Sequence, residues 1–71
     1  MEQILDYIKQ SAILQRNKAL LSLTLLYNKS VGIGDHSTND YYKNIDEAFD
    51  MFCDAEDKLE HIKKLKKILK D

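Results

Sequence analysis

The chain has 71 residues and a mass of 8.3 kDa, enough for at most one small domain. Its net charge is −1, and its 44% of hydrophobic residues are too many for a disordered tail. With 32% charged residues, two glycines, no proline and one cysteine, the composition is typical of long exposed helices and excludes an internal disulfide or a four-thiolate zinc site.

The first residues, MEQILDYIKQ, place acids where a secretory signal has a basic leader and an apolar core. The most apolar stretch, residues 19–27, has nine residues, whereas a helix that crosses a bilayer needs about 20. We therefore expect a cytoplasmic protein with no membrane contact. In that reducing setting Cys53 is expected to be a free thiol, buried or half-buried near the helix contact.

A first helix is predicted over residues 2–30, because the chain has no glycine or proline there and its apolar residues repeat at helical spacing. Gly32 suits the left-handed position just past a helix, where a side chain would be strained. Ile33 then suits the hydrophobic contact that accompanies such a helix end. Residues 31–37 are therefore predicted to form the turn.

The first predicted helix has apolar residues on two sides. One stripe contains small residues that allow close approach of another helix, and it consists of Ile4, Leu5, Ile8, Ala12, Ala19, Leu23 and Leu26. A second stripe on roughly the opposite side consists of Tyr7, Leu14, Leu21 and Leu25. A helix that is apolar on two sides is normally buried between two neighbours. One partner helix in the same chain covers only one of the two stripes.

A second helix is predicted over residues 38–70. Ser37 or Thr38 starts it, since Ser37 to Asp40 resembles a capping box; Asn44 offers a later alternative. Apolar residues then follow in steps of four and three, the spacing of a coiled-coil seam, at Tyr41, Ile45, Ala48, Phe52, Ala55, Leu59 and Ile62. A lysine breaks the next step, and the apolar face continues in Leu65, Ile68 and Leu69.

Two long helices and a short connection predict an all-α antiparallel helical hairpin, with residues 1–71 as its single domain. In chains this small, a lone core rarely supplies more than about 3–5 kcal/mol, and oligomerisation is common. We therefore expect self-association through Tyr7, Leu14, Leu21 and Leu25. The default is a homodimer in which two hairpins form a four-helix bundle with the first helices inside. A different protein partner and a monomer are the alternatives.

The predicted turn carries both glycines of the chain. A phosphate-binding loop needs a preceding strand and a longer glycine pattern, so Gly32, Ile33 and Gly34 favour helix capping. Asp35 and His36 could act as acid and base or as metal ligands only with further groups close by. The other histidine and the cysteine lie roughly 25–35 Å along the second helix. We expect no catalytic, cofactor or metal site, and the turn remains either a cap or a recognition feature.

Lysines gather at the end of the second helix, at Lys63, Lys64, Lys66, Lys67 and Lys70. Clustered cations bind nucleic-acid phosphates, and Lys9 and Arg16 of the first helix would add to such a surface. The chain is net acidic, however, and lysines at a helix C-terminus also complement the helix dipole. A solvated helix face is the favoured interpretation, with nucleic-acid contact as the alternative.

The segment LYNKSVGIGDHS, from Leu26 to Ser37, contains the one distinctive motif of the chain, its turn, and the acidic second helix contains AEDKLE from Ala55 to Glu60. In these segments and in its length and layout, the chain resembles small uncharacterised helical-hairpin proteins of T-even-type tailed bacteriophages, such as the accessory protein encoded beside a phage recombination helicase. The resemblance implies a phage protein made in the cytoplasm of a bacterial host. It implies no catalytic residues.

Together these features predict a small non-enzymatic helical protein that acts through protein–protein interaction, as a phage accessory factor. The turn at residues 31–37 or the charged second helix would face the partner. The alternative is an accessory nucleic-acid-binding protein in phage replication or recombination that uses the lysine-rich end of the second helix.

Overall fold

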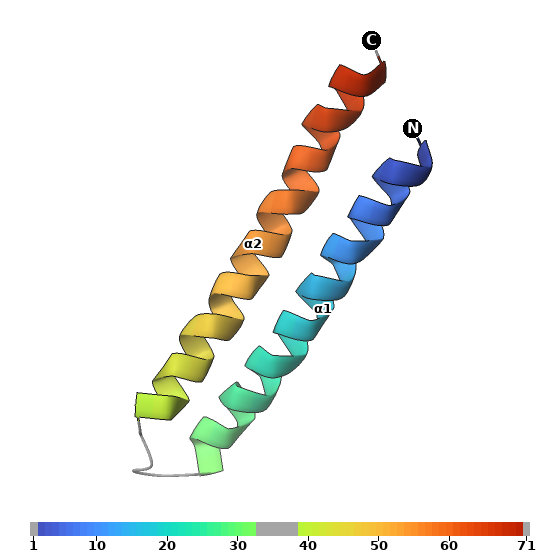
Figure 1. Cartoon of the computed structure of the whole chain (residues 1–71). Coiled ribbons are helices and arrows are strands. Elements are labelled where there is room, and N and C mark those ends of the chain that lie inside the picture. The colour runs from blue at the N-terminus through green and yellow to red at the C-terminus, as the bar shows by residue number, and fades with distance from the viewer. Residues whose placement is uncertain (1, 33–38, 71) are drawn as a thin grey trace.

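The computed structural model describes residues 2–32 and 39–70, and the side chains of residues 2–28 and 40–70. Helix α1 comprises Glu2–Gly32 and helix α2 comprises Asn39–Lys70. The two helices lie side by side and run antiparallel (Figure 1), which confirms the predicted all-α hairpin. The molecule is a rod whose Cα positions extend over 55 × 15 × 14 Å.

One inner helix boundary differs slightly from the prediction. α1 continues through Gly32, so this glycine is helical and is not the cap expected just past the helix. α2 is described from Asn39, and residue 38, where the prediction starts it, lies outside the described residues. Such shifts are common because the last turn of a helix makes few hydrogen bonds within the helix. The remainder of the predicted turn, residues 33–37, lies outside the described residues.

The four alanines of the chain form the contact between the helices. Ala12 and Ala19 of α1 and Ala48 and Ala55 of α2 are between 0% and 4% exposed. The two alanines of each helix are seven residues apart, so they lie on one line that faces the other helix. Because a methyl group occupies little space, the helix backbones approach closely there. We call these four residues the alanine seam.

Larger apolar side chains flank the alanine seam and are half-buried. They are Leu5, Ile8, Leu23 and Leu26 in α1, and Tyr41, Ile45, Phe52, Leu59, Ile62, Leu65 and Leu69 in α2. Their burial confirms the predicted seam of α2. Among the side chains that the structure describes, none larger than alanine is buried.

Three side chains are less buried than the sequence predicts. Ile4 and Ile68 are expected at the helix contact, but both are exposed. Ile4 precedes Leu5 and Ile68 precedes Leu69, and these two leucines face the other helix. One position along a helix is a rotation of about 100°, so both isoleucines are turned away from the helix contact. Cys53 is expected to be at least half-buried and is also exposed. It lies two positions before Ala55, which turns it toward the outer side of α2.

A polar cluster connects the helices on one side of the alanine seam. The side-chain amide of Gln15 in α1 donates to the carbonyl oxygen of Met51 and to the Asp54 carboxylate, both at 3.0 Å. Lys58 Nζ donates to Gln15 Oε1 at 2.8 Å and lies 3.2 Å from the Asp54 carboxylate. These bonds fix the register of the two helices near the middle of the rod.

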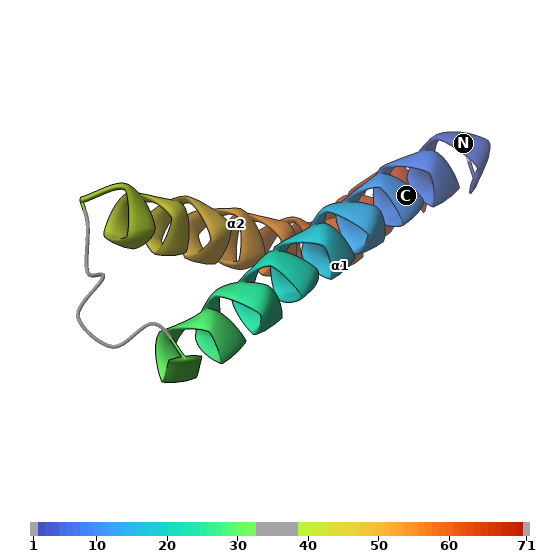
Figure 2. The same cartoon turned by 90° about the horizontal axis from the view of Figure 1, so that it is seen from below.

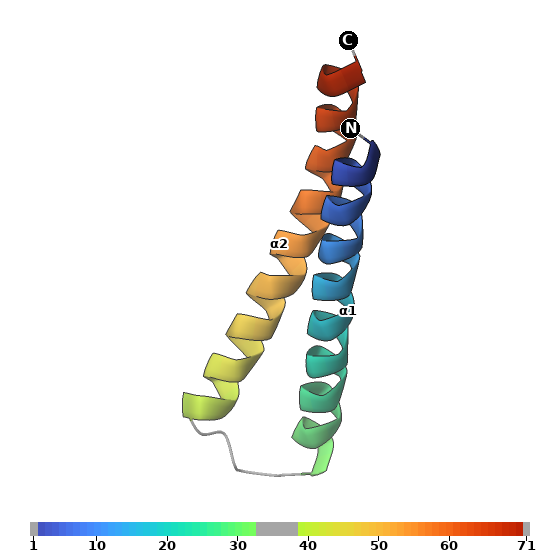
Figure 3. The same ribbon diagram turned by 45° about the vertical axis from the view of Figure 1, so that its right-hand side comes forward.

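Two further contacts cross between the helices. Arg16 forms an ion pair with Glu56 at 3.7 Å on the other side of the alanine seam. Nearer the junction of the helices, the Tyr41 hydroxyl donates to the carbonyl oxygen of Leu26 at 2.8 Å. Figures 2 and 3 show that the helices cross at a shallow angle and separate toward this junction. We call the end with Gly32 the connected end and the opposite end the open end.

The alanine seam predicts a strong penalty for a larger side chain. Ala55→Leu should destabilise the hairpin by about 1–3 kcal/mol, because the added atoms force the helices apart. Cys53→Leu is the matched control; it adds a leucine on the exposed side of the same helix and should change stability by less than about 0.5 kcal/mol. Urea unfolding followed by far-UV circular dichroism at one protein concentration measures both. Equal stabilities of the two variants would contradict the close packing.

Candidate interaction surfaces

The side of α1 that faces away from α2 carries a row of large apolar side chains. Tyr7 is 74% exposed, Leu21 62%, and Leu14 and Leu25 55% each. We call these four residues the outer stripe. As the sequence predicts, α2 leaves this stripe uncovered. Large exposed apolar patches usually mark contact sites, so the outer stripe is the first candidate interaction surface.

The lysine-rich end of α2 is a second candidate surface. Its five lysines, Lys63, Lys64, Lys66, Lys67 and Lys70, are all exposed. Lys63 lies 3.5 Å from the Glu60 carboxylate of the same helix. The sequence analysis predicts that Lys9 and Arg16 of α1 add to this surface. Lys9 is exposed, whereas Arg16 forms an ion pair with Glu56.

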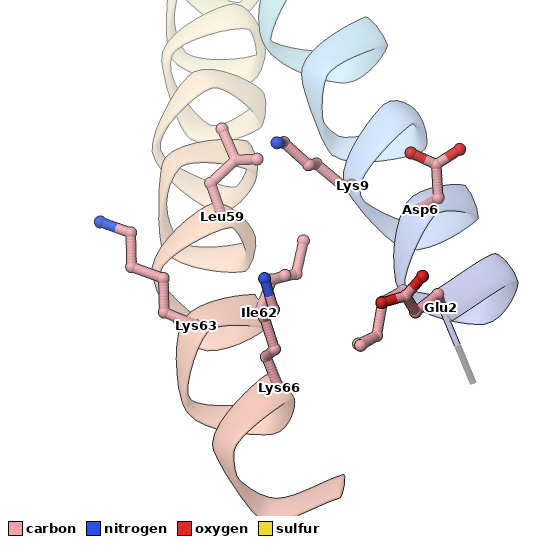
Figure 4. A pocket seen from close by; sticks show the side chains of 8 residues that line it. Glu2, Asp6, Lys9, Leu59, Ile62, Lys63 and Lys66 are labelled. Atoms are coloured by element: carbon pink, nitrogen blue, oxygen red, sulfur yellow. The ribbon is translucent and has the colours of Figure 1, made fainter. Parts of the chain in front are cut away.

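A groove opens between the helices at the open end of the rod. Glu2, Asp6 and Lys9 line it from α1, and Lys63 and Lys66 line it from α2. Figure 4 shows the two carboxylates on the α1 side and the side chains of Lys9 and Lys66 in the space between the helices. Leu5, Leu59 and Ile62 complete its lining. The groove therefore has two carboxylates and one lysine on its α1 edge and two lysines on its α2 edge.

The described part of the structure brings no metal-binding group of side chains together. Of the predicted turn residues, Gly32 ends α1, and Ile33, Gly34, Asp35 and His36 lie outside the described residues. Over residues 2–32 and 39–70, no three His, Cys, Asp or Glu residues are placed to hold a metal ion.

The second histidine of the chain, His61, has local contacts within α2. Its Nδ1 lies 2.9 Å from the backbone carbonyl oxygen of Asp57 and 3.5 Å from the carboxylate of the same residue. The ring therefore interacts with the preceding turn of its own helix.

A group of exposed side chains escaped the sequence analysis. Leu20 and Tyr27 of α1 and Tyr42 and Phe49 of α2 are all at least 43% exposed, although all are large and apolar or aromatic. In each helix the two residues are seven positions apart, as are the alanines of the seam. Counting heptads outward from the alanines would have revealed them.

Neither helix, over the residues that the structure describes, has a stretch long and apolar enough to cross a lipid bilayer. Comparison with protein-family models gives no match, and comparison with curated proteins and solved structures gives no significant one. The candidate surfaces must therefore be interpreted from their own chemistry.

Among the titratable side chains that the structure describes, Asp54 has the pKa that its surroundings change most clearly. The hydrogen bond from Gln15, followed by the hydrogen bond and the positive charge of Lys58, holds the pKa of this carboxyl below its ordinary value. A carboxyl with a lowered pKa in the folded state stabilises the fold above the pKa that it has in the unfolded chain. That stabilisation disappears as the pH falls through the folded-state pKa.

Asp54→Asn should therefore destabilise the hairpin at neutral pH, and the difference from the wild type should shrink as the pH falls below about 4. Urea midpoints measured across this pH range test the expectation. Asp50→Asn is the control, because Asp50 is an exposed carboxylate of α2 outside the Gln15 cluster. If the Asp54→Asn difference does not depend on pH, the carboxylate does not contribute through these contacts.

Proposed function

We propose that this protein acts by binding protein surfaces rather than by catalysis, with the outer stripe of α1 as the contact. The observation that supports this most is the exposure of Tyr7, Leu14, Leu21 and Leu25 in one row. Full burial of a leucine contributes about 1.5–3 kcal/mol. Three leucines from one chain are therefore enough for a substantial interface.

A second copy of the chain is the partner that we propose for the outer stripe. A two-fold axis brings the same surface of both copies together, so a single apolar stripe is complementary to itself. Pairing through α1 would place both α1 helices inside a four-helix bundle and both α2 helices outside. The charged outer side of α2 and the turn at residues 31–37 would then remain available to another protein.

We also propose an accessory role for the protein in a bacteriophage, in the cytoplasm of the host cell. The support for this is the resemblance of residues 26–37 and 55–60 to small helical-hairpin proteins of T-even-type phages. The absence of a membrane-spanning stretch in the described helices agrees with it.

Replacing the outer-stripe leucines tests the proposed contact. Leu14→Gln combined with Leu21→Gln should halve the mass of the assembly, because each substitution places an amide in the apolar contact. Sedimentation equilibrium of wild type and variant measures this. Asn17→Gln combined with Asn28→Gln, two exposed α1 positions outside the stripe, should leave the mass unchanged. An unaltered mass in the leucine variant would refute the outer stripe as a self-association surface.

Nucleic-acid binding is the second candidate function, favoured by the exposure of all five lysines at the end of α2. If these lysines each contact a phosphate of duplex DNA, the logarithm of the binding constant should fall with the logarithm of salt concentration with a slope of about −4 to −5. Lys64→Gln combined with Lys67→Gln should reduce this slope by about 2. A slope near zero, or no retention at low salt, would leave protein binding as the function.

A further inference from the structure

The hairpin has an apolar face that is formed by both helices and is distinct from the outer stripe. α1 contributes the half-buried Ile13, the 43% exposed Leu20 and the exposed Tyr27. α2 contributes Tyr42 and Phe49, which are 55% and 54% exposed. We call these five residues the two-helix face. Leu20, Tyr27, Tyr42 and Phe49 occupy the half of the rod that is nearer the connected end, and Ile13 lies nearer the open end.

The heptad positions place these residues on one side of the rod. Leu20 follows Ala19 by one position and Phe49 follows Ala48 by one, so each is turned by about 100° from the alanine seam in the same sense. In two antiparallel helices that face each other, the same sense of rotation leads to the same side of the pair. The two sets of side chains therefore belong to one surface.

The cross-helix contacts support this assignment. Glu56 also follows a seam alanine by one position, and it reaches Arg16 of α1 on this side at 3.7 Å. Asp54 precedes the same alanine and instead contacts Gln15, on the opposite side of the seam. The ion pair thus marks the middle of the two-helix side. Leu20, Tyr27, Tyr42 and Phe49 lie toward the connected end, and Ile13 lies just beyond the ion pair toward the open end.

Charges of opposite sign occupy the same side at the open end. Asp6 follows the half-buried Leu5 of α1 by one position, and Lys63 follows the half-buried Ile62 of α2 by one position. Both are therefore turned toward the same side of the rod as the two-helix face. They line the groove together with Glu2 and Lys66 (Figure 4). On this side of the rod, α1 therefore carries two carboxylates and Lys9 at the open end, and α2 carries two lysines.

We propose that a second copy of this chain packs against the two-helix face, with its connected end at the same end of the assembly. A two-fold axis along the rod then places α1 of one copy antiparallel to α2 of the other. The apolar halves of the two faces meet, and the carboxylates at Glu2 and Asp6 meet the partner's Lys63 and Lys66. The reverse orientation would place an apolar half against a charged groove and is disfavoured by desolvation.

The proposed contact uses the whole side of the rod, the apolar half together with the charged groove. The Cα positions of the rod extend over 55 Å. The contact does not use the outer stripe, which lies on another side of α1. Self-association through the two-helix face and binding through the outer stripe can therefore be tested separately.

Opposite charge reversals in two copies test the proposal. One copy carries Lys63→Glu and Lys66→Glu, which makes its open end acidic; the other carries Glu2→Lys and Asp6→Lys, which makes its open end basic. Both copies also carry Leu14→Gln and Leu21→Gln, so that pairing through the outer stripe does not contribute. Each copy alone should then self-associate about tenfold more weakly than the Leu14→Gln, Leu21→Gln protein without charge reversals, and the mixture should form mixed pairs about tenfold in excess of like pairs. Native mass spectrometry at low salt measures this, and added salt should reduce the preference.

Two control arms separate this proposal from the outer stripe. Lys64→Glu with Lys67→Glu makes the same charge change on exposed lysines outside the groove, and it should give no preference when mixed with the basic copy. The charge-reversal mixture is also measured with Leu14 and Leu21 unchanged, where like pairs through the outer stripe should reappear beside the mixed pairs. Random pairing of the charge-reversed copies, with their helicity intact by circular dichroism, would overturn the proposal.

Discussion

Close packing of two helices on four methyl groups is the constraint from which the remaining features of the structure follow. At Ala12, Ala19, Ala48 and Ala55, no space is left between the helices for a larger side chain. The leucines, isoleucines and aromatic residues therefore lie at the flanks of the seam or beyond it. The tight core of one hairpin is thus also the reason why so much of its apolar surface stays uncovered.

That uncovered surface is not evenly distributed. Both helices have large apolar side chains at one flank, and α1 also has them on its outer side, whereas the outer side of α2 is polar. A helix with the distribution of α1 is normally covered by more than one neighbour. Charges add direction to the contacts, since acids at the start of α1 and lysines at the end of α2 lie along the same groove.

The sequence predicts the hairpin, the seam of α2 and the exposure of the outer stripe, because each follows from periodicity within one helix. It does not predict the two-helix face, since Leu20 and Phe49 become neighbours in one surface only when the two helices are placed together. The predicted burial of Cys53 and Ile68 is wrong for a related reason. Each lies one or two positions from a residue that faces the other helix, and this displacement turns its side chain away from the contact. The expected glycine cap is misplaced because helix ends depend on few bonds.

The most direct test of the account is the melting temperature of the full chain as a function of its concentration. If the alanine seam leaves the hairpin with too little buried surface, folding is coupled to association, and the melting temperature followed by far-UV circular dichroism should rise steadily with the logarithm of concentration. A melting temperature that does not change over a thousandfold dilution, with full helicity in the most dilute sample, would show that one hairpin is sufficient by itself and would contradict the account.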